Sequence, residues 1–294
     1  MRSDEKRTFY YQASASSLGG FIDKPFQEAI PSQASVSLPS VGGYATTRTE
    51  AFNFKEIISC RAAYTRVLGR QIAENGPWSI TATAVVEGLK ILEVFTAERI
   101  VAQVSVEYPQ VSVEDPGKRQ YPKVSLAGSS FERLRLGGCD VTPTMNSNLL
   151  CGARAPITYP VFSLTGQAQA ARIIRDIEED RKQGDFDEER DDFQWLAERF
   201  GWMASNQKPG EDRCVLSSLV DGINRPVNGK DLPIPGSFGH VLEIPDFGRV
   251  FLGELLVCPS SVQVFSFRFD LGCGTGGHGS GPSTNVQGGT IPPL

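Results

Sequence analysis

The sequence predicts a mainly β protein, with antiparallel sheets packed as a sandwich or an irregular barrel and an acidic two-helix hairpin inserted into them. Three observations lead to this prediction. Apolar and polar residues alternate along many short stretches, as in strands with one buried face. The 30 Gly and 19 Pro residues supply frequent turns between such strands. One stretch, 165–205, departs from this pattern and has helical periodicity instead.

The N-terminal part predicts short strands separated by turns. Ala34, Val36 and Leu38 alternate with serines, and Pro39 and then Gly42-Gly43 end this strand. The following stretch, 46–68, is ambiguous. Its phenylalanines fit a strand that turns into a short helix, and its apolar residues also fit helical spacing throughout.

A long strand pair, Ser79–Tyr108, is predicted in the middle of the β core. Small and β-branched residues occupy every second position in both halves of this stretch, which suits a half-buried pleated surface. Glu87-Gly88 interrupts the alternation and predicts a bend or bulge between two strand pairings.

The helical stretch predicts a hairpin of two helices. The first carries Ala170, Ile173, Ile174 and Ile177 on one stripe and ends at Gly184. The second is predicted to begin at Asp185, with Glu188 in a capping box, and its apolar face is formed by Phe193, Leu196, Phe200 and Met203. The hairpin is distinctly acidic. Its acidic residues form either a solvated surface or a docking surface for a basic protein partner. They are Glu178, Glu179, Asp180, Asp187, Glu188, Glu189, Asp191 and Asp192.

The chain then returns to strands and ends in a segment rich in Gly and Pro. Phe265, Phe267 and Phe269 alternate along one predicted strand, which indicates core or interface rather than chemistry. We therefore expect an interface, if there is one, to involve these three phenylalanines and Trp195 and Trp202 of the hairpin. The final segment is expected to be flexible unless it pairs with another strand. The predicted divisions are a first β part at 1–164, the hairpin at 165–205, a second β part at 206–272 and a flexible tail at 273–294.

Composition narrows the classes of function. The net charge of −5 and the pI of about 5.3 argue against a nucleic-acid partner. No stretch approaches the length of apolar sequence that spans a bilayer, so a membrane location is not expected. The first residues, MRSDEKRTFYYQ, lack an apolar run of signal-peptide length, which predicts a soluble cytoplasmic protein. Leaderless export or a processed start would give the same pattern.

The six cysteines contain no CxxC pair, which argues against a zinc ribbon. In the absence of a signal peptide, free buried thiols are the favoured interpretation and disulfides the alternative.

No catalytic, cofactor or metal site is predicted. Gly272, Gly274 and Gly277 spell GxGxxG, but the sequence after them cannot form the helix that a dinucleotide site needs. His240 and His278 are the only histidines, and His240 is interpreted as a structural or surface residue. Four acids on or beside the central strands are interpreted as solvent-facing, the alternative being a catalytic pair in a cavity; they are Glu87, Glu93, Glu98 and Glu107.

Several separated segments resemble a bacterial family named choice-of-anchor P. They are ASASSLGG near the N-terminus, SITATAVVEGLKIL with ERIVAQVSVEY, SLAGSSFERLRLGGCDVTP, and IPDFGRVFLGELLV followed by a strand. These segments cover about half the chain in the order of that family. The resemblance implies a surface-type β domain without an established activity, so it implies no catalytic residue. The chain differs from that family in its inserted acidic hairpin, and from its sequence we expect neither the signal peptide nor the sorting tail of that family.

The sequence therefore predicts a non-enzymatic structural or binding protein that self-associates into a homo-oligomer or filament. Exposed strand edges, the strand of phenylalanines and the terminal segments are the expected contacts. Two alternatives stay open: an enzyme that uses strand-borne carboxylates in a barrel cavity, and a toxin-like β protein that inserts a hairpin into membranes.

Overall fold

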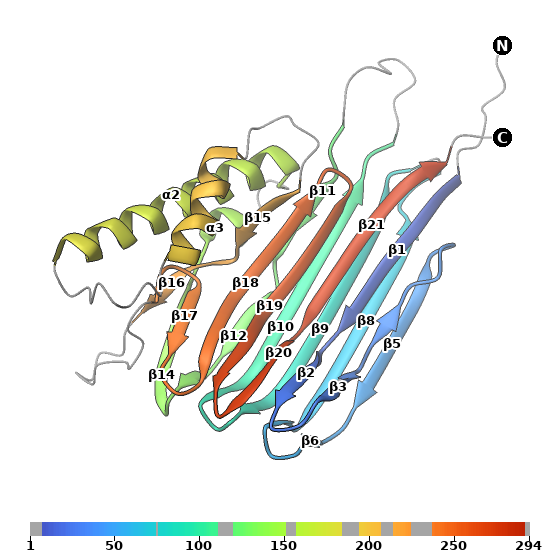
Figure 1. Ribbon diagram of the computed structural model, residues 1–294. Helices are drawn as coiled ribbons and strands as arrows, with labels where there is room; N and C mark the ends of the chain where they lie inside the picture. Colours follow the sequence, from blue (N-terminus) through green and yellow to red (C-terminus); the bar gives the residue numbers. More distant parts are fainter. Residues whose placement is uncertain are drawn as a thin grey trace, which may run out of the picture.

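The computed structural model describes residues 8–74, 76–110, 120–150, 157–183, 194–206, 214–224 and 237–291. These residues form two antiparallel sheets that face each other as a sandwich, with helices at one side (Figure 1). This confirms the predicted fold class and selects the sandwich over the barrel. No helix within the described ranges is long and apolar enough to cross a bilayer.

The first sheet, here called sheet A, contains both ends of the described chain. Its ten strands are β1 Thr8–Ser16, β2 Leu18–Lys24, β3 Glu28–Gln33, β4 Val36–Ser37, β15 Val215–Ser218, β17 Val241–Ile244, β18 Gly248–Cys258, β19 Ser261–Cys273, β20 Thr275–Ser280 and β21 Ser283–Ile291. β18 pairs with β19, β19 pairs with both β20 and β21, and β21 pairs with β1 along nine residues. The N-terminal strand β1 is therefore hydrogen-bonded to the C-terminal strand β21.

The prediction of a flexible tail at 273–294 is consequently wrong for the residues that the structure describes. β20 and β21 lie in the interior of sheet A and have a partner strand on each side. The Gly-rich sequence allows close packing, because a Cβ built on Gly281 would lie 1.9 Å from a ring carbon of the buried Phe267. The glycines thus make room for aromatic core residues instead of providing mobility.

The second sheet, sheet B, is built around the predicted central strand pair. Its eleven strands are β5 Gly43–Thr49, β6 Phe52–Phe54, β7 Ile58–Cys60, β8 Ala62–Gln71, β9 Trp78–Ile91, β10 Phe95–Tyr108, β11 Lys123–Ser125, β12 Ser130–Glu132, β13 Leu134–Leu136, β14 Cys139–Met145 and β16 Val220–Asn224. β9 and β10 pair along almost their full length, as the alternation predicted. The ambiguous stretch 46–68 forms strands throughout, interrupted by turns.

Gly88 lies where β9 changes its partner strand from β8 to β7, which confirms the predicted interruption. Its φ of 61° is in the left-handed region. Before Gly88 the even-numbered residues of β9, up to Val86, face the core, and after it the odd-numbered residues do so, beginning with Leu89. Gly253 of β18, with a φ of 64°, marks a similar change between Leu252 and Leu255. The interior accordingly divides into two apolar clusters that follow one another along the strands.

The helices are α1 Ser147–Leu150, α2 Tyr159–Gln183 and α3 Gln194–Asn206. α2 begins earlier than predicted, and Pro160 occupies its first turn, where a missing backbone N–H costs nothing. The expected apolar faces are confirmed, because Ala170, Ile173 and Ile177 of α2 and Leu196, Phe200 and Met203 of α3 are buried together against β17 and β18. The predicted helix end at Gly184, the start at Asp185, its capping partner Glu188 and the apolar Phe193 lie outside the described residues.

Candidate functional site

Glu254 is a carboxylate that is only 2% exposed, in the middle of the apolar strand β18. It lies on the outer face of sheet A beneath α3. Arg199 of α3 donates a hydrogen bond to one carboxylate oxygen at 2.5 Å, and Arg268 of β19 donates to the other at 2.6 Å. His240 Nε2 lies 3.7 Å from Glu254 Oε1, which is longer than a hydrogen bond.

His240 and the two arginines keep this buried carboxylate ionised. Burial by itself raises the pKa of Glu254, but His240, Arg199 and Arg268 act in the opposite direction and lower the pKa to about 2. An ionised acid inside a protein is tolerated when both oxygens are bonded to cations. Because Arg199 belongs to α3 and Arg268 to β19, the cluster of Glu254, Arg199, Arg268 and His240 fixes the helical hairpin on sheet A.

Aromatic side chains complete the surroundings of this buried cluster. Both arginines lie over the ring of Phe251, Arg199 at 5.3 Å and Arg268 at 4.7 Å from its centroid. The ring of His240 meets that of Phe200 edge to face. The cluster is therefore packed as a structural joint. His240 is only 2% exposed and packs within this cluster, so it has the structural role that the sequence predicted.

A second polar group, centred on Asp221, holds α2 against the sandwich. Asn146 and Gln169 each donate to the same oxygen of Asp221 at 3.0 Å. Gln169 also exchanges two bonds with the backbone of Ser218, and Arg172 donates to the Asp221 carbonyl. The bonds between Gln169 and Ser218 are buried and those to Asp221 are partly buried, which is typical of a structural connection.

Two cavities flank this group and share Arg172 and Asp221. One has a volume of about 370 Å³ and is also lined by Asp176 and Ser237, and the other, of about 390 Å³, is also lined by Asn148 and Thr165. Each is large enough for a small polar molecule.

The phenylalanines that were predicted as an interface are mainly core residues. Phe267 and Phe269 are completely buried between the sheets and contact one another, so they cannot form an interface in the folded chain. This part of the prediction is wrong, because β19 lies in the middle of sheet A. Phe265 is half-buried on the outer face, since the strand changes its inward-facing positions at Ser266.

The two predicted tryptophans differ in their surroundings. Trp195 is half-buried, with its ring stacked under Arg249 at 4.3 Å and meeting Phe251 edge to face. Trp202 is 57% exposed on α3, and its role at an interface stays a prediction. Of the acidic surface, Glu178 and Glu179 are exposed on α2, while the acids of 184–193 lie outside the described residues.

The acids of the central strands lie apart on the outer surface of sheet B. They form ion pairs with Arg61, Lys90, Arg133 and Lys123, at N–O distances from 2.7 to 3.5 Å. The interpretation as solvent-facing residues is confirmed for Glu87, Glu93, Glu98 and Glu107, and the catalytic pair is wrong for these four. Over the described ranges, no group of three His, Cys, Asp or Glu side chains is placed to hold a metal ion.

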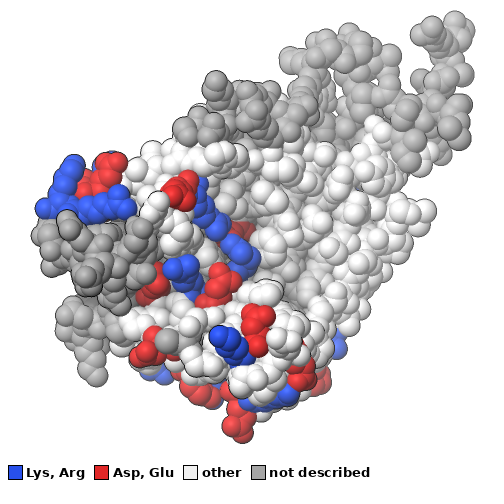
Figure 2. Space-filling view, viewed as in Figure 1, with Lys and Arg blue, Asp and Glu red and all other residues white. Residues whose placement is uncertain are grey.

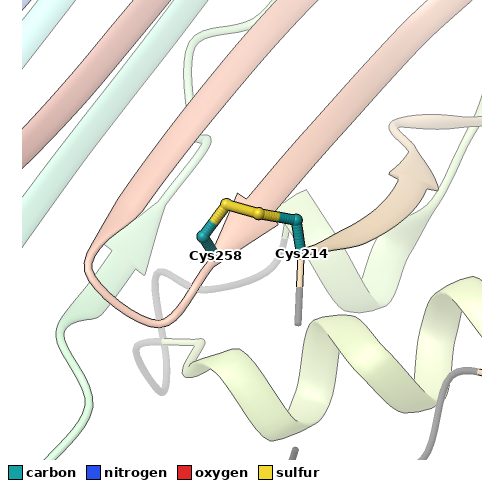
Figure 3. The surroundings of a disulfide bond; sticks show 2 residues. All are labelled: Cys214 and Cys258. Carbon is teal, nitrogen blue, oxygen red and sulfur yellow. A yellow bond between two sulfur atoms is a disulfide. The ribbon is translucent and has the colours of Figure 1, made fainter. Parts of the chain in front are cut away.

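One disulfide joins Cys214, just before β15, to Cys258 at the end of β18 (Figure 3). The prediction of free thiols is wrong for this pair, because antiparallel pairing of β15 with β18 brings cysteines distant in sequence side by side. The prediction is confirmed for Cys60 and Cys139, which are free thiols, while Cys151 and the side chain of Cys273 lie outside what the structure describes. Burial raises the pKa of the Cys60 thiol, which suits an unreactive core residue.

Strand edges are the remaining predicted contact, and β5 presents the longest uninterrupted one. In the part of the chain that the structure describes, β5 pairs with β8 alone, and it forms the rim of the sandwich (Figure 1). It contains no proline, whereas the edge strand β3 contains Pro31. Its single charge, Arg48, forms an ion pair with Glu50 at 2.8 Å.

Comparison with known proteins places this architecture in a family. The model of a domain of unknown function, DUF8256, matches residues 9–258. The chain belongs to the DUF8256 family. No curated protein and no solved structure matches the chain. The match ends at the last residue of β18, although β19, β20 and β21 fill the interior of sheet A. The resemblance to choice-of-anchor P domains stays a prediction.

Sequence reasoning missed Glu254 and Asp221, the acids at the centre of both polar groups. A signal for Glu254 is present: it is the only acid in the stretch from Gly248 to Cys258, which is otherwise apolar except for Arg249 near its start. A lone acid in a strand of this kind must find cations once the strand is buried on both faces. Asp221 carries no comparable signal.

Proposed function

We propose that this protein is a non-enzymatic structural or binding subunit that associates with a second copy through the outer edge of β5. The observation that carries the proposal is the seven-residue edge strand itself, which offers unpaired backbone donors and acceptors along one side. Two such edges can pair antiparallel around a two-fold axis and join two sandwiches into one continuous sheet.

The protections that usually prevent such pairing are weak on β5. Edge strands are commonly blocked by proline, by a bulge or by a charge that points inward. The pairing of β5 with β8 is regular, and its half-buried positions carry Ala45, Thr47 and Thr49, which are small and uncharged. Ala45 packs against the apolar core, so these positions face the space between the sheets.

An inward-facing charge on β5 tests this proposal. In the variant Thr47→Lys, the ammonium can reach water from an open edge, but it would be buried in a sheet that continues into a second copy. We expect the wild-type protein to form a dimer or larger assembly in light scattering coupled to size exclusion, and Thr47→Lys to be monomeric.

The control is Thr46→Lys, which places the same charge on the solvent-facing side of the neighbouring position. We expect this variant to retain the mass of the wild-type assembly. A wild-type protein that is strictly monomeric at high concentration would contradict the proposal, as would equal behaviour of the two lysine variants.

A further inference from the structure

The outer face of sheet A carries a broad surface without charge. β1 and β21 contain no Asp, Glu, Lys or Arg, and neither does β19 from Ser261 to Phe267. The chain as a whole has 29 basic and 34 acidic residues, so this surface differs strongly from the rest. In Figure 2 it is the white area over β1, β19 and β21. We call it the neutral face.

Amide and hydroxyl side chains form rows across this face. In one row, Gln12 lies opposite Gln287, which lies opposite Ser261. The next row contains Ser14, Asn285 and Gln263. All six side chains are exposed or half-buried, because the residues between them point into the core. Neighbouring strands lie about 4.8 Å apart, so the rows present a regular grid of donors and acceptors.

An aromatic ring lies on the same face, at the end of the grid. Tyr10 follows the same outward alternation as Gln12, and its cross-strand partner is Gly289. A Cβ built on Gly289 would lie 3.1 Å from Tyr10 Cε1, so the tyrosine ring leans over the space that the glycine leaves. Half-buried in this way, the ring presents an apolar surface with a polar end beside the amides.

We propose that the neutral face binds a neutral, hydroxyl-rich polysaccharide. A surface without cations offers nothing to the phosphates of nucleic acids or lipids, and a surface of amides and hydroxyls is too polar to resemble an apolar protein interface. Sugar hydroxyls both donate and accept hydrogen bonds, as do the paired glutamines and the Ser14, Asn285 and Gln263 row. A sugar ring also presents an apolar face that can lie on Tyr10.

Native electrophoresis in gels containing neutral polysaccharides provides the test. The net charge of −5 lets the protein migrate, and binding slows it. With a panel of neutral glucan, mannan, galactan and xylan, we expect slower migration in at least one. Because no ion pair is involved, we expect this effect to persist in a pull-down with the insoluble form of that polysaccharide as salt rises from about 0.05 to about 0.5 M.

A triple variant, Gln12→Ala with Asn285→Ala and Gln287→Ala, should weaken binding about tenfold or more, since each substitution removes a donor and an acceptor. The matched control is Thr81→Ala with Ser105→Ala, which removes a pair of hydroxyls that lie 3.0 Å apart on the outer face of sheet B. We expect the control to bind like the wild-type protein. Circular dichroism establishes that both variants are folded.

Three results would overturn the proposal: normal migration in every neutral polysaccharide, binding that salt abolishes, or equal binding by the triple variant and the wild-type protein. A triple variant that changes the molecular mass in light scattering without affecting polysaccharide binding would show that the neutral face is an interface between copies. Thr47→Lys, which tests the edge of β5, should bind polysaccharide normally, so the two proposals can fail separately.

Discussion

At the scale of single residues, Glu254 shows how one charge organises its surroundings. An ionised carboxylate on a buried strand is stable here because Arg199 and Arg268 bond both of its oxygens. Such a pair adds little net stability over an apolar replacement, but removing one member leaves the others buried and uncompensated.

The lowered pKa of Glu254 predicts a loss of stability in acid. The folded chain holds this pKa at about 2, below the ordinary value of 4.5, so the carboxylate stabilises the fold above about pH 4.5. This contribution, on the order of 3 kcal/mol, should disappear as the pH falls from about 4.5 towards about 2. Urea unfolding between pH 7 and pH 2.5 measures it.

The variant Glu254→Gln separates the contribution of Glu254 to the pH dependence of stability from that of the other acids. At pH 7 we expect a loss of about 3 kcal/mol or more, because two arginines then lose their buried counter-charge. The decline between about pH 4.5 and about pH 2 should be correspondingly smaller in the variant. Glu93→Gln, which removes an exposed ion pair with Lys90, should cost less than about 1 kcal/mol. Equal losses in the two variants would contradict the role assigned to Glu254.

At the scale of elements, the disulfide connects the start of β15 with the end of β18, beside the sheet area that the helices cover (Figure 3). It closes a segment with a sequence separation of 44 residues. A cross-link of this length restricts the unfolded chain more than the folded one.

Loss of this bond should destabilise the protein. Cys214→Ser with Cys258→Ser is expected to lower the free energy of unfolding by about 2–4 kcal/mol. Urea unfolding with and without dithiothreitol measures the effect, since reductant should act on the wild-type protein and not on the double variant. A wild-type protein with the same stability in both conditions would contradict the assignment. Cys60→Ala should show the same response to reductant as the wild-type protein.

At the scale of the whole molecule, the ends of the chain close sheet A. β1 pairs with β21, and β21 pairs with β19, so the first and last strands depend on each other (Figure 1). The family match at 9–258 includes β1 from Phe9 onward but excludes β19 and β21, the two strands that lie between β18 and β1, and it also excludes β20.

A chain that ends at residue 258 is therefore expected not to fold. Without β19, β20 and β21, one face of each core cluster is exposed, and β1 loses the partner that pairs with it along nine residues. Circular dichroism and thermal unfolding test this expectation. A cooperative transition in the shorter fragment would contradict the dependence of β1 on β21.

Local patterns in the sequence were sufficient to predict the central strands, the alternation of their buried and exposed residues, and the buried faces of the helices. The period of two in 79–108 predicted β9 and β10, and Gly88 was recognised as the change between two pairings. The buried stripe of α2 followed from helical spacing. These features depend on residues close in sequence, and their physical cause is the fixed geometry of strand and helix.

The sequence by itself thus determined a mainly β chain with an amphipathic helical hairpin, and tertiary structure decided which strands lie inside. The order of strands in sheet A places β19 at its centre, so Phe267 and Phe269 are core residues. The same order places β20 and β21 of the Gly-rich end between two partner strands each. It also brought Cys214 to Cys258 and Arg199 to Glu254. Contacts of this kind join residues distant in the chain, and the energy that selects them comes from burial of the whole core rather than from any local pattern.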